Sequence, residues 1–139
     1  MGNLTYDRVL AMQDRGIQNA SFPPAFIEGF RPTLNKTLTV TLGGGVTTVE
    51  GTDVVMSETL ITRQMWRSPY TGGDDGWFYY IYLQKDGTYM VDATKPAYSD
   101  RYFYYSHPVF GHRVIARLWL DSDDKIKFVS REFRDTPRS

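Results

Sequence analysis

The segment of residues 77–83 limits the fold more than any other part of the sequence, because every residue in it is aromatic or aliphatic. Side chains of a strand point alternately to opposite faces, so both faces of this segment carry large apolar groups. Asp86-Gly87 follows shortly afterwards and is typical of a tight hairpin turn. The sequence therefore predicts a central β-strand that is covered on both sides.

Strand patterns continue through most of the chain after Lys36. Further strands are predicted over residues 37–42, 46–49, 53–56, 59–66, 88–91, 112–120 and 125–133. Gly43 to Gly45 indicate a loose turn, and residues 92–111 a long connection. We expect an all-β fold, a compact antiparallel β-sandwich or small barrel of about seven or eight short strands.

Residues 1–35 differ from the β domain that is expected over residues 36–139. Residues 5–16 have the pattern of a short helix, and an extended segment rich in proline and phenylalanine follows. The aromatic and proline side chains of this arm are Phe22, Pro23, Pro24, Phe26 and Phe30. We expect the arm to bind a neighbouring protein or, alternatively, to wrap around the domain's own surface.

Composition excludes several classes of protein. The chain has 139 residues, a formal net charge of zero and no cysteine, which excludes disulfides, cysteine zinc sites and thiol nucleophiles. Balanced charge disfavours general nucleic-acid binding, which depends on many phosphate contacts. No apolar run is long enough for a transmembrane helix. We therefore expect neither a nucleic-acid nor a membrane partner.

Catalytic and metal-binding patterns are weak. His107 and His112 are the two histidines, and their spacing of five residues identifies no third ligand. The Asp121 to Asp124 segment lacks the glycine and glutamate of a calcium loop and is expected to form a polar turn. We predict a protein that is not an enzyme and needs no cofactor or metal. A hydrolase or isomerase using the two histidines as bases is the minor alternative.

Aromatic residues crowd the stretch from Trp66 to Phe110, and three interpretations of them stay open. They fill a small β core, form a subunit interface, or stack on sugar rings or bases. The candidates for an interface or a glycan site are Tyr70, Trp77, Tyr102, Phe103, Tyr104 and Tyr105. Asp74 and Asp75 lie close to Tyr70 and Trp77 in the sequence and would supply polar groups for a sugar.

Residues 37–133 resemble the small β modules of tailed-bacteriophage structural proteins, such as tail fibres, tail spikes, baseplate adaptors, collars and head decorations. The resemblance lies in the order of elements: a glycine-flanked hairpin over residues 38–55, the aromatic strand of residues 77–83 ending at Asp86-Gly87, a proline loop at residues 94–98, and a closing hairpin over residues 112–128. Where such modules often have Arg-x-x-Gly in the closing hairpin, this chain has Arg113 to Ala116.

The resemblance implies a virion structural protein that is assembled in the bacterial host cytoplasm. Such modules commonly form trimers, and their N-terminal arms commonly attach to the particle. We therefore expect a homo-oligomer, with a trimer favoured, whose partners are other tail, collar, baseplate or capsid proteins. A carbohydrate-binding module for host surface glycans is the alternative function.

Overall fold

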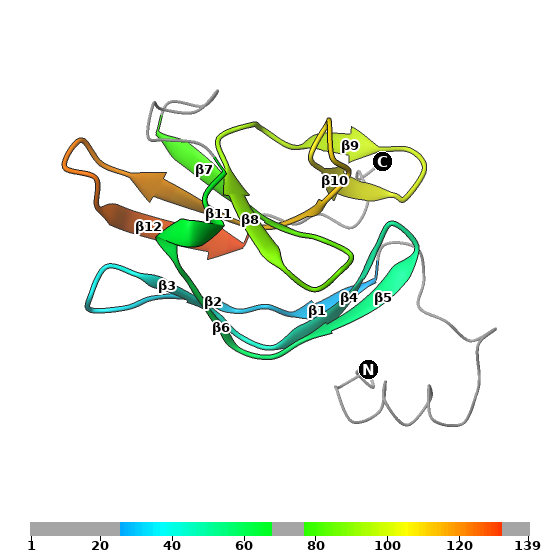
Figure 1. Ribbon diagram of the computed structural model, residues 1–139, viewed down its shortest axis with the longest axis horizontal. Helices are drawn as coiled ribbons and strands as arrows, with labels where there is room; N and C mark the ends of the chain where they lie inside the picture. Colours follow the sequence, from blue (N-terminus) through cyan, green and yellow to red (C-terminus); the bar gives the residue numbers. More distant parts are fainter. Residues whose placement is uncertain (1–25, 68–76, 132–139) are drawn as a thin grey trace.

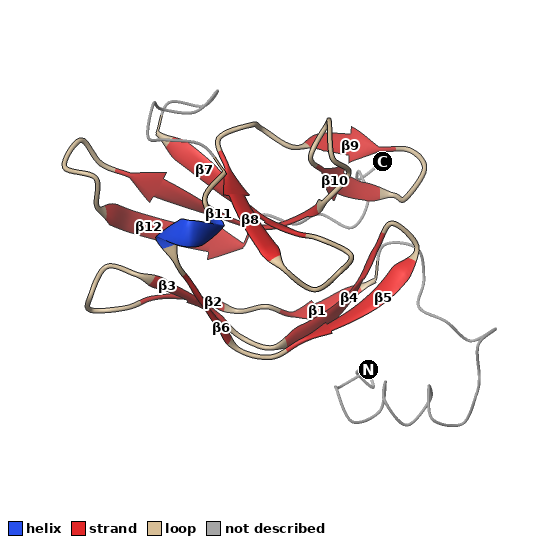
Figure 2. Ribbon diagram, in the orientation of Figure 1, coloured by secondary structure: helices blue, strands red, loops and turns tan. Residues whose placement is uncertain are grey.

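Two layers of antiparallel strands face each other across one core in the computed structural model (Figures 1 and 2). The structure describes residues 26–67 and 77–131. Within these ranges there are twelve strands, and the one helical element is the short 3-10 turn η2 (Arg63–Met65). The predicted all-β class is confirmed, and the sheets do not close into a barrel.

The first layer, at the bottom of Figure 1, is a three-stranded meander that is bent across its middle. Its strands are β1 (Ile27–Gly29), β2 (Pro32–Leu34), β3 (Val40–Leu42), β4 (Gly45–Val49), β5 (Thr52–Met56) and β6 (Thr59–Ile61). Two residues at most separate β1 from β2, β3 from β4 and β5 from β6. The paired orders β1-β4-β5 and β2-β3-β6 therefore describe the two halves of the same three long strands.

Glycines make the bend of this layer possible. The backbone of Phe30 and Gly44 continues the pairing through the bend, with an N–H···O distance of 3.1 Å. A Cβ atom on Gly45 would lie 2.5 Å from Cδ2 of Phe30, so only glycine lets this ring enter the core. The Gly43 to Gly45 segment is thus a bend between two strands rather than the predicted loose turn, because it pairs with the bend after β1.

The second layer is a six-stranded sheet in the order β8-β7-β11-β10-β9, with β12 also paired to β11. Its strands are β7 (Phe78–Leu83), β8 (Tyr89–Asp92), β9 (Ala97–Ser99), β10 (Tyr104–Ser106), β11 (Arg113–Leu120) and β12 (Ile126–Arg131). On one side β11 pairs with β7, and on the other its beginning pairs with β10 and its end with β12. The predicted central position of the aromatic strand β7 is confirmed.

The core lies between the layers and takes alternate residues from each strand. Tyr79, Ile81 and Leu83 of β7 point into it and are completely buried. Tyr80 and Tyr82 point to the other side of the sheet, where they pack with Val114. Both faces of β7 are therefore covered, as the sequence predicted.

The β domain begins earlier than the predicted boundary at residue 36. Residues 27–34 form β1 and β2, which pair with β4 and β3. Phe30 is completely buried in the core, so it does not belong to a surface that binds a partner. The physical reason is that its left-handed backbone, with a φ of 58°, turns the ring inward at the bend. The predicted helix of residues 5–16 lies outside the described residues.

Three further predictions differ in detail. Residues 92–111 contain the β9–β10 hairpin, so the strands outnumber the predicted seven or eight. The strand expected over residues 59–66 ends at Ile61, because η2 follows and turns the chain. Trp66 then packs on Tyr79, with 4.8 Å between the centroids of the two rings. A bulge between Val114 and Ala116 puts these two residues in different clusters, whereas the regular strand predicted over residues 112–120 would place both on one face.

Candidate functional site

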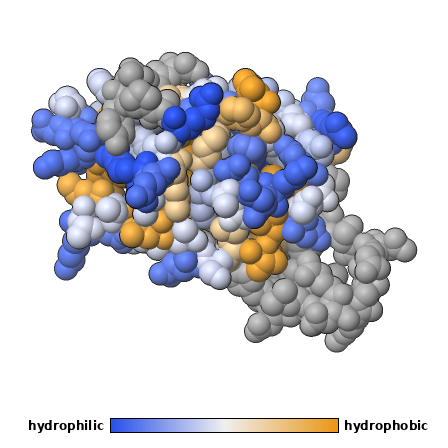
Figure 3. All heavy atoms as spheres, in the orientation of Figure 1, coloured by the Kyte–Doolittle hydropathy of each residue, from blue (hydrophilic) through white to orange (hydrophobic). Residues whose placement is uncertain are grey.

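The outer face of the six-stranded sheet carries aromatic side chains, where an outward sheet face usually carries polar ones. Its members are Phe78, Tyr80, Tyr82, Met90, Tyr105, Arg117, Trp119 and Phe128. The first layer differs: a cross-strand row on it consists of Thr33, Thr41 and Leu60, which includes no aromatic residue. In the view of Figure 3, hydrophobic side chains form separate patches between hydrophilic ones. The outer face of the six-stranded sheet is therefore our candidate site.

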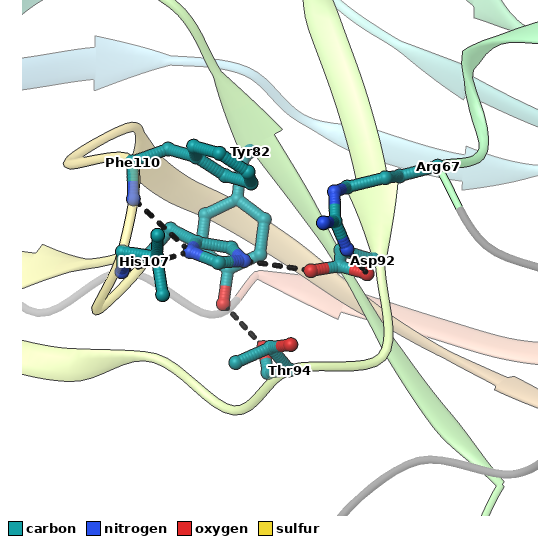
Figure 4. A network of polar contacts seen from close by, with 7 residues as sticks. Arg67, Tyr82, Asp92, Thr94, His107 and Phe110 are labelled. Atoms are coloured by element: carbon teal, nitrogen blue, oxygen red, sulfur yellow. Dashed lines mark hydrogen bonds and ion pairs between the residues drawn. The ribbon is translucent and has the colours of Figure 1, made fainter.

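One end of this face is covered by the loop of residues 107–112, which we call the histidine loop. His107 and Asp92 hold it in place, with 2.6 Å between Nε2 and Oδ2, and both residues are almost completely buried (Figure 4). The backbone N–H groups of Val109 and Phe110 donate to Nδ1 of His107 at 3.1 and 3.3 Å. The imidazole therefore connects the tip of its own loop to strand β8.

This geometry defines the chemistry of the imidazole. Nδ1 accepts hydrogen bonds from two N–H groups and so has no proton of its own. Nε2 therefore carries the proton of the ring and donates a hydrogen bond to Asp92. Both nitrogens are occupied, so the ring offers no lone pair to a substrate. The Asp92–His107 pair resembles the acid–histidine part of a catalytic triad in its distance but acts as a structural clamp.

Asp92 is ionised within this clamp. Burial opposes ionisation of its carboxyl group, but the hydrogen bonds from His107 and Thr94 and the positive charge of Arg67 outweigh that effect and lower its pKa. The guanidinium of Arg67 is half-exposed, and its Nη1 lies 3.7 Å from Oδ1. The hydroxyl of Tyr82, whose ring packs edge-on against His107, donates to the carbonyl of Thr94 at 2.5 Å.

The other end of the outer face is more open and carries a row of three rings. Trp119 of β11 is the cross-strand neighbour of both Phe78 and Phe128. We call these three residues the aromatic row. The guanidinium of Arg117 stacks on the ring of Phe78 at 4.4 Å and lies 5.9 Å from that of Phe128. Phe128 remains 42% exposed, which makes it the most accessible member of the row.

A second polar network joins the two layers inside the molecule. Arg113 of β11 is completely buried, and its Nη1 donates to Thr47 Oγ1 at 2.8 Å and to the carbonyl of Phe26 at 3.1 Å. Its guanidinium also stacks on the ring of Tyr104 at 4.4 Å, and the Tyr104 hydroxyl accepts the N–H of Glu50 at 2.7 Å. Burial raises the pKa of Tyr104. Tyr104 therefore belongs to the interior and offers nothing to a partner.

The structure separates the site residues that the sequence grouped together. Trp77 is 40% exposed and directly precedes β7, at the place where β7 lies beside the end of β11. The segment of residues 102–105 lies near the beginning of β11 instead. Six residues of strand separate the two places, or about 20 Å. Tyr102 stacks on Tyr104, Tyr105 packs edge-on against Tyr98, and Phe103 is 44% exposed in the β9–β10 turn.

The predicted candidates Phe22, Pro23, Pro24 and Tyr70 lie outside the described residues. Phe26 is half-buried beside β4, where its carbonyl accepts the hydroxyl of Thr47 at 2.8 Å, so its backbone is tied to the domain. Of the two interpretations of the arm, its described part, residues 26–35, follows the one in which it packs on its own domain.

Sequence reasoning missed the residues that define the outer face. Asp92 carried no signal, because its partner His107 is fifteen residues away and only the fold brings them together. Trp119 was detectable in principle, since it alternates with Leu118 and Leu120 of the core in a predicted strand. Phe128 was not, because it follows the core residue Ile126 by two positions, and only the bulge in the β11–β12 pairing turns it outward. The Asp121 turn is confirmed: its Oδ1 accepts the N–H groups of Asp123 and Lys125 at 2.9 Å.

Over residues 26–67 and 77–131, no cluster of three or more acidic or histidine side chains is arranged to hold a metal ion. No helix in these ranges has the length and apolar character that a bilayer span requires. Comparison of the chain with protein-family models, curated proteins and solved structures found no match.

Proposed function

We propose that the protein is a non-enzymatic structural protein of a tailed-phage virion, which associates with further copies of itself through its β domain. The observation that carries the proposal is the outer face of the six-stranded sheet. Tyr80 and Tyr82 are buried within the domain, but the rest of this face stays accessible through aromatic, methionine and arginine side chains, the types enriched in protein interfaces. These side chains are Phe78, Met90, Tyr105, Arg117, Trp119 and Phe128, and the face has few of the lysines and glutamates that interfaces lack. The virion part of the proposal rests on the resemblance in element order.

The proposal includes attachment to a neighbouring virion protein through the residues before Phe26. Because β1 and β2 belong to the sandwich, an informative truncation ends at residue 25 and leaves the Phe26 carbonyl for Arg113 and Thr47. We expect the truncated chain to fold and to keep its state of association, but to be absent from purified particles. Full incorporation of the truncated chain would refute the anchoring role.

The virion location has its own test. An antibody against the β domain should detect the protein in particles purified from lysates of infected cells, in a constant ratio to the capsid protein. Detection only in the soluble fraction of the lysate would contradict a structural role in the virion.

Carbohydrate recognition is the second candidate function, favoured by the β9–β10 turn. Exposed Phe103 and half-buried Tyr102 lie there beside Arg101, whose guanidinium is 5.2 Å from the Tyr102 ring. Rings next to a hydrogen-bond donor suit a sugar. A glycan array with the full-length protein in its native state of association tests this, with Phe103→Ala as the variant. Binding that the substitution abolishes would support it, and the absence of any binding would exclude it for the glycans tested.

A further inference from the structure

The geometry points to the aromatic row as a contact between two copies of this chain, related by a two-fold axis. This inference rests on the proposed self-association and specifies its surface and symmetry. The row consists of Phe78, Trp119 and Phe128, with Arg117 stacked against it. The row lies on one face of the sheet, and sheet faces pack on other sheet faces through interdigitating side chains.

The neighbouring edge of β12 is less suited to pairing with a second copy. Lys127 and Arg131 lie on this strand without an acidic residue, and cationic side chains discourage pairing between sheet edges. Arg131 also donates to the carbonyl of Gly29 at 3.1 Å, which ties the end of β12 to the first layer. These features favour the outward face over the edge of β12 as the surface for association.

The charges of the chain allow a second copy to bind at the aromatic row. The chain has a formal net charge of zero, so two copies do not repel each other as a whole. The charged residues near the row also carry both signs: Lys127, next to Phe128 in β12, is 3.9 Å from Asp121. A surface balanced in this way meets its own equivalent without a like-charge cost. A strongly charged partner would gain nothing from it.

The area of sheet around the aromatic row predicts how strong the contact between two copies is. Three strands at about 4.8 Å spacing and six residues at about 3.3 Å cover about 14 by 20 Å of sheet. A standard stable interface buries about 800 Å² on each partner, and this patch, at about 280 Å², is only about a third of that area, so the contact can only be transient. A patch that packs on its own equivalent forms a closed pair. We therefore expect a dimer that dissociates on dilution, rather than the trimer that the phage resemblance implies.

The first experiment measures the molar mass of the full-length protein by sedimentation velocity from about 1 µM to about 1 mM. We expect a dimer at high concentration and a monomer at low concentration. Phe128→Ser should leave a monomer throughout this range. Leu60→Ser is the matched control, because Leu60 is 49% exposed on the opposite layer, and this variant should still form the dimer.

The outcomes separate this inference from the proposed self-association. A trimer or larger ring that Phe128→Ser leaves intact would overturn the two-fold contact but keep self-association. A wild-type monomer at every concentration would overturn both. Loss of the dimer in Leu60→Ser but not in Phe128→Ser would place the contact on the first layer and refute the inference.

A cross-linking experiment covers the case in which Phe128→Ser does not fold. The chain has no cysteine, so a single Ser130→Cys substitution introduces the only thiol. Ser130 is the cross-strand neighbour of Arg117 and lies on the outer face. A short bis-maleimide should link two copies of this variant, whereas Ser57→Cys, exposed on the first layer, should stay unlinked. Equal cross-linking of the two variants would refute the assignment.

Discussion

Replacing Asp92 by alanine removes the acceptor that holds the histidine loop on the sheet. The bond that is lost joins two side chains that are each about 2% exposed, with 2.6 Å between His107 Nε2 and Asp92 Oδ2. Removing the acceptor leaves the N–H of the neutral His107 ring buried without a partner, which costs about 1–3 kcal/mol. This is a substantial part of the about 5–15 kcal/mol that stabilises a typical domain. Asp92→Asn keeps an acceptor oxygen and should cost less.

Urea unfolding followed by circular dichroism gives these free energies, and a double-mutant cycle isolates the pair. The Asp92→Ala and His107→Ala variants together should show a coupling of about 1.5–3 kcal/mol. Arg67→Ala is the control, because its half-exposed ion pair at 3.7 Å is worth less than about 1 kcal/mol.

Amide hydrogen exchange adds a local measurement of the same clamp. The amides of Val109 and Phe110 donate to the imidazole, so they should exchange slowly in the wild type and rapidly in both alanine variants. A coupling below about 0.5 kcal/mol, together with unchanged exchange of these two amides, would refute the clamp.

Three further predictions concern single residues, each measured by urea unfolding. Gly45→Ala should destabilise the fold by about 1–3 kcal/mol, because the new Cβ would meet the Phe30 ring. Gly43→Ala should be close to neutral, because its Cβ would lie 3.5 Å from the nearest neighbouring atom. Equal effects of the two substitutions would contradict the packing of the bend. Tyr104→Phe should cost about 1–3 kcal/mol, since the part-buried N–H of Glu50 that donates to its hydroxyl would lose its partner. Unchanged stability would argue against this hydrogen bond. Burial lowers the pKa of His112, so the folded state favours its neutral form, and stability should fall as the pH drops below about 6.5. This loss of stability should be smaller in His112→Phe. An identical pH profile of the variant and the wild type would contradict the assignment.

The central strand and its hairpins were predictable from the sequence, because their signals are local. Two-sided aromatic alternation identified β7, and Asp86-Gly87 and the Asp121 turn identified hairpin ends. The bend of the first layer was not predictable, since the segment from Gly43 to Gly45 reads as a turn until its pairing with the backbone at Phe30 is known.

The candidate site was harder to predict than the fold. Aromatic residues were expected to form a surface, but the sequence does not say which face of the sheet each ring occupies. The bulge at β11 illustrates this limit, because one extra residue puts Val114 on the outer side while Ile115 and Ala116 both contribute to the core. The pairing of Asp92 with His107 depends on the histidine loop folding back over the sheet, which no local pattern encodes.

The contacts of Arg113 have a consequence for the order in which the chain folds. The β7–β8 and β11–β12 hairpins join residues close in sequence, whereas Arg113 reaches Thr47 and Phe26, which are 66 and 87 residues away. Contacts that close such long loops lose the most chain entropy and form late. The two hairpins should therefore fold first, and docking of the first layer should complete the native state. Substitution of Arg113 should accordingly speed unfolding and change the folding rate little.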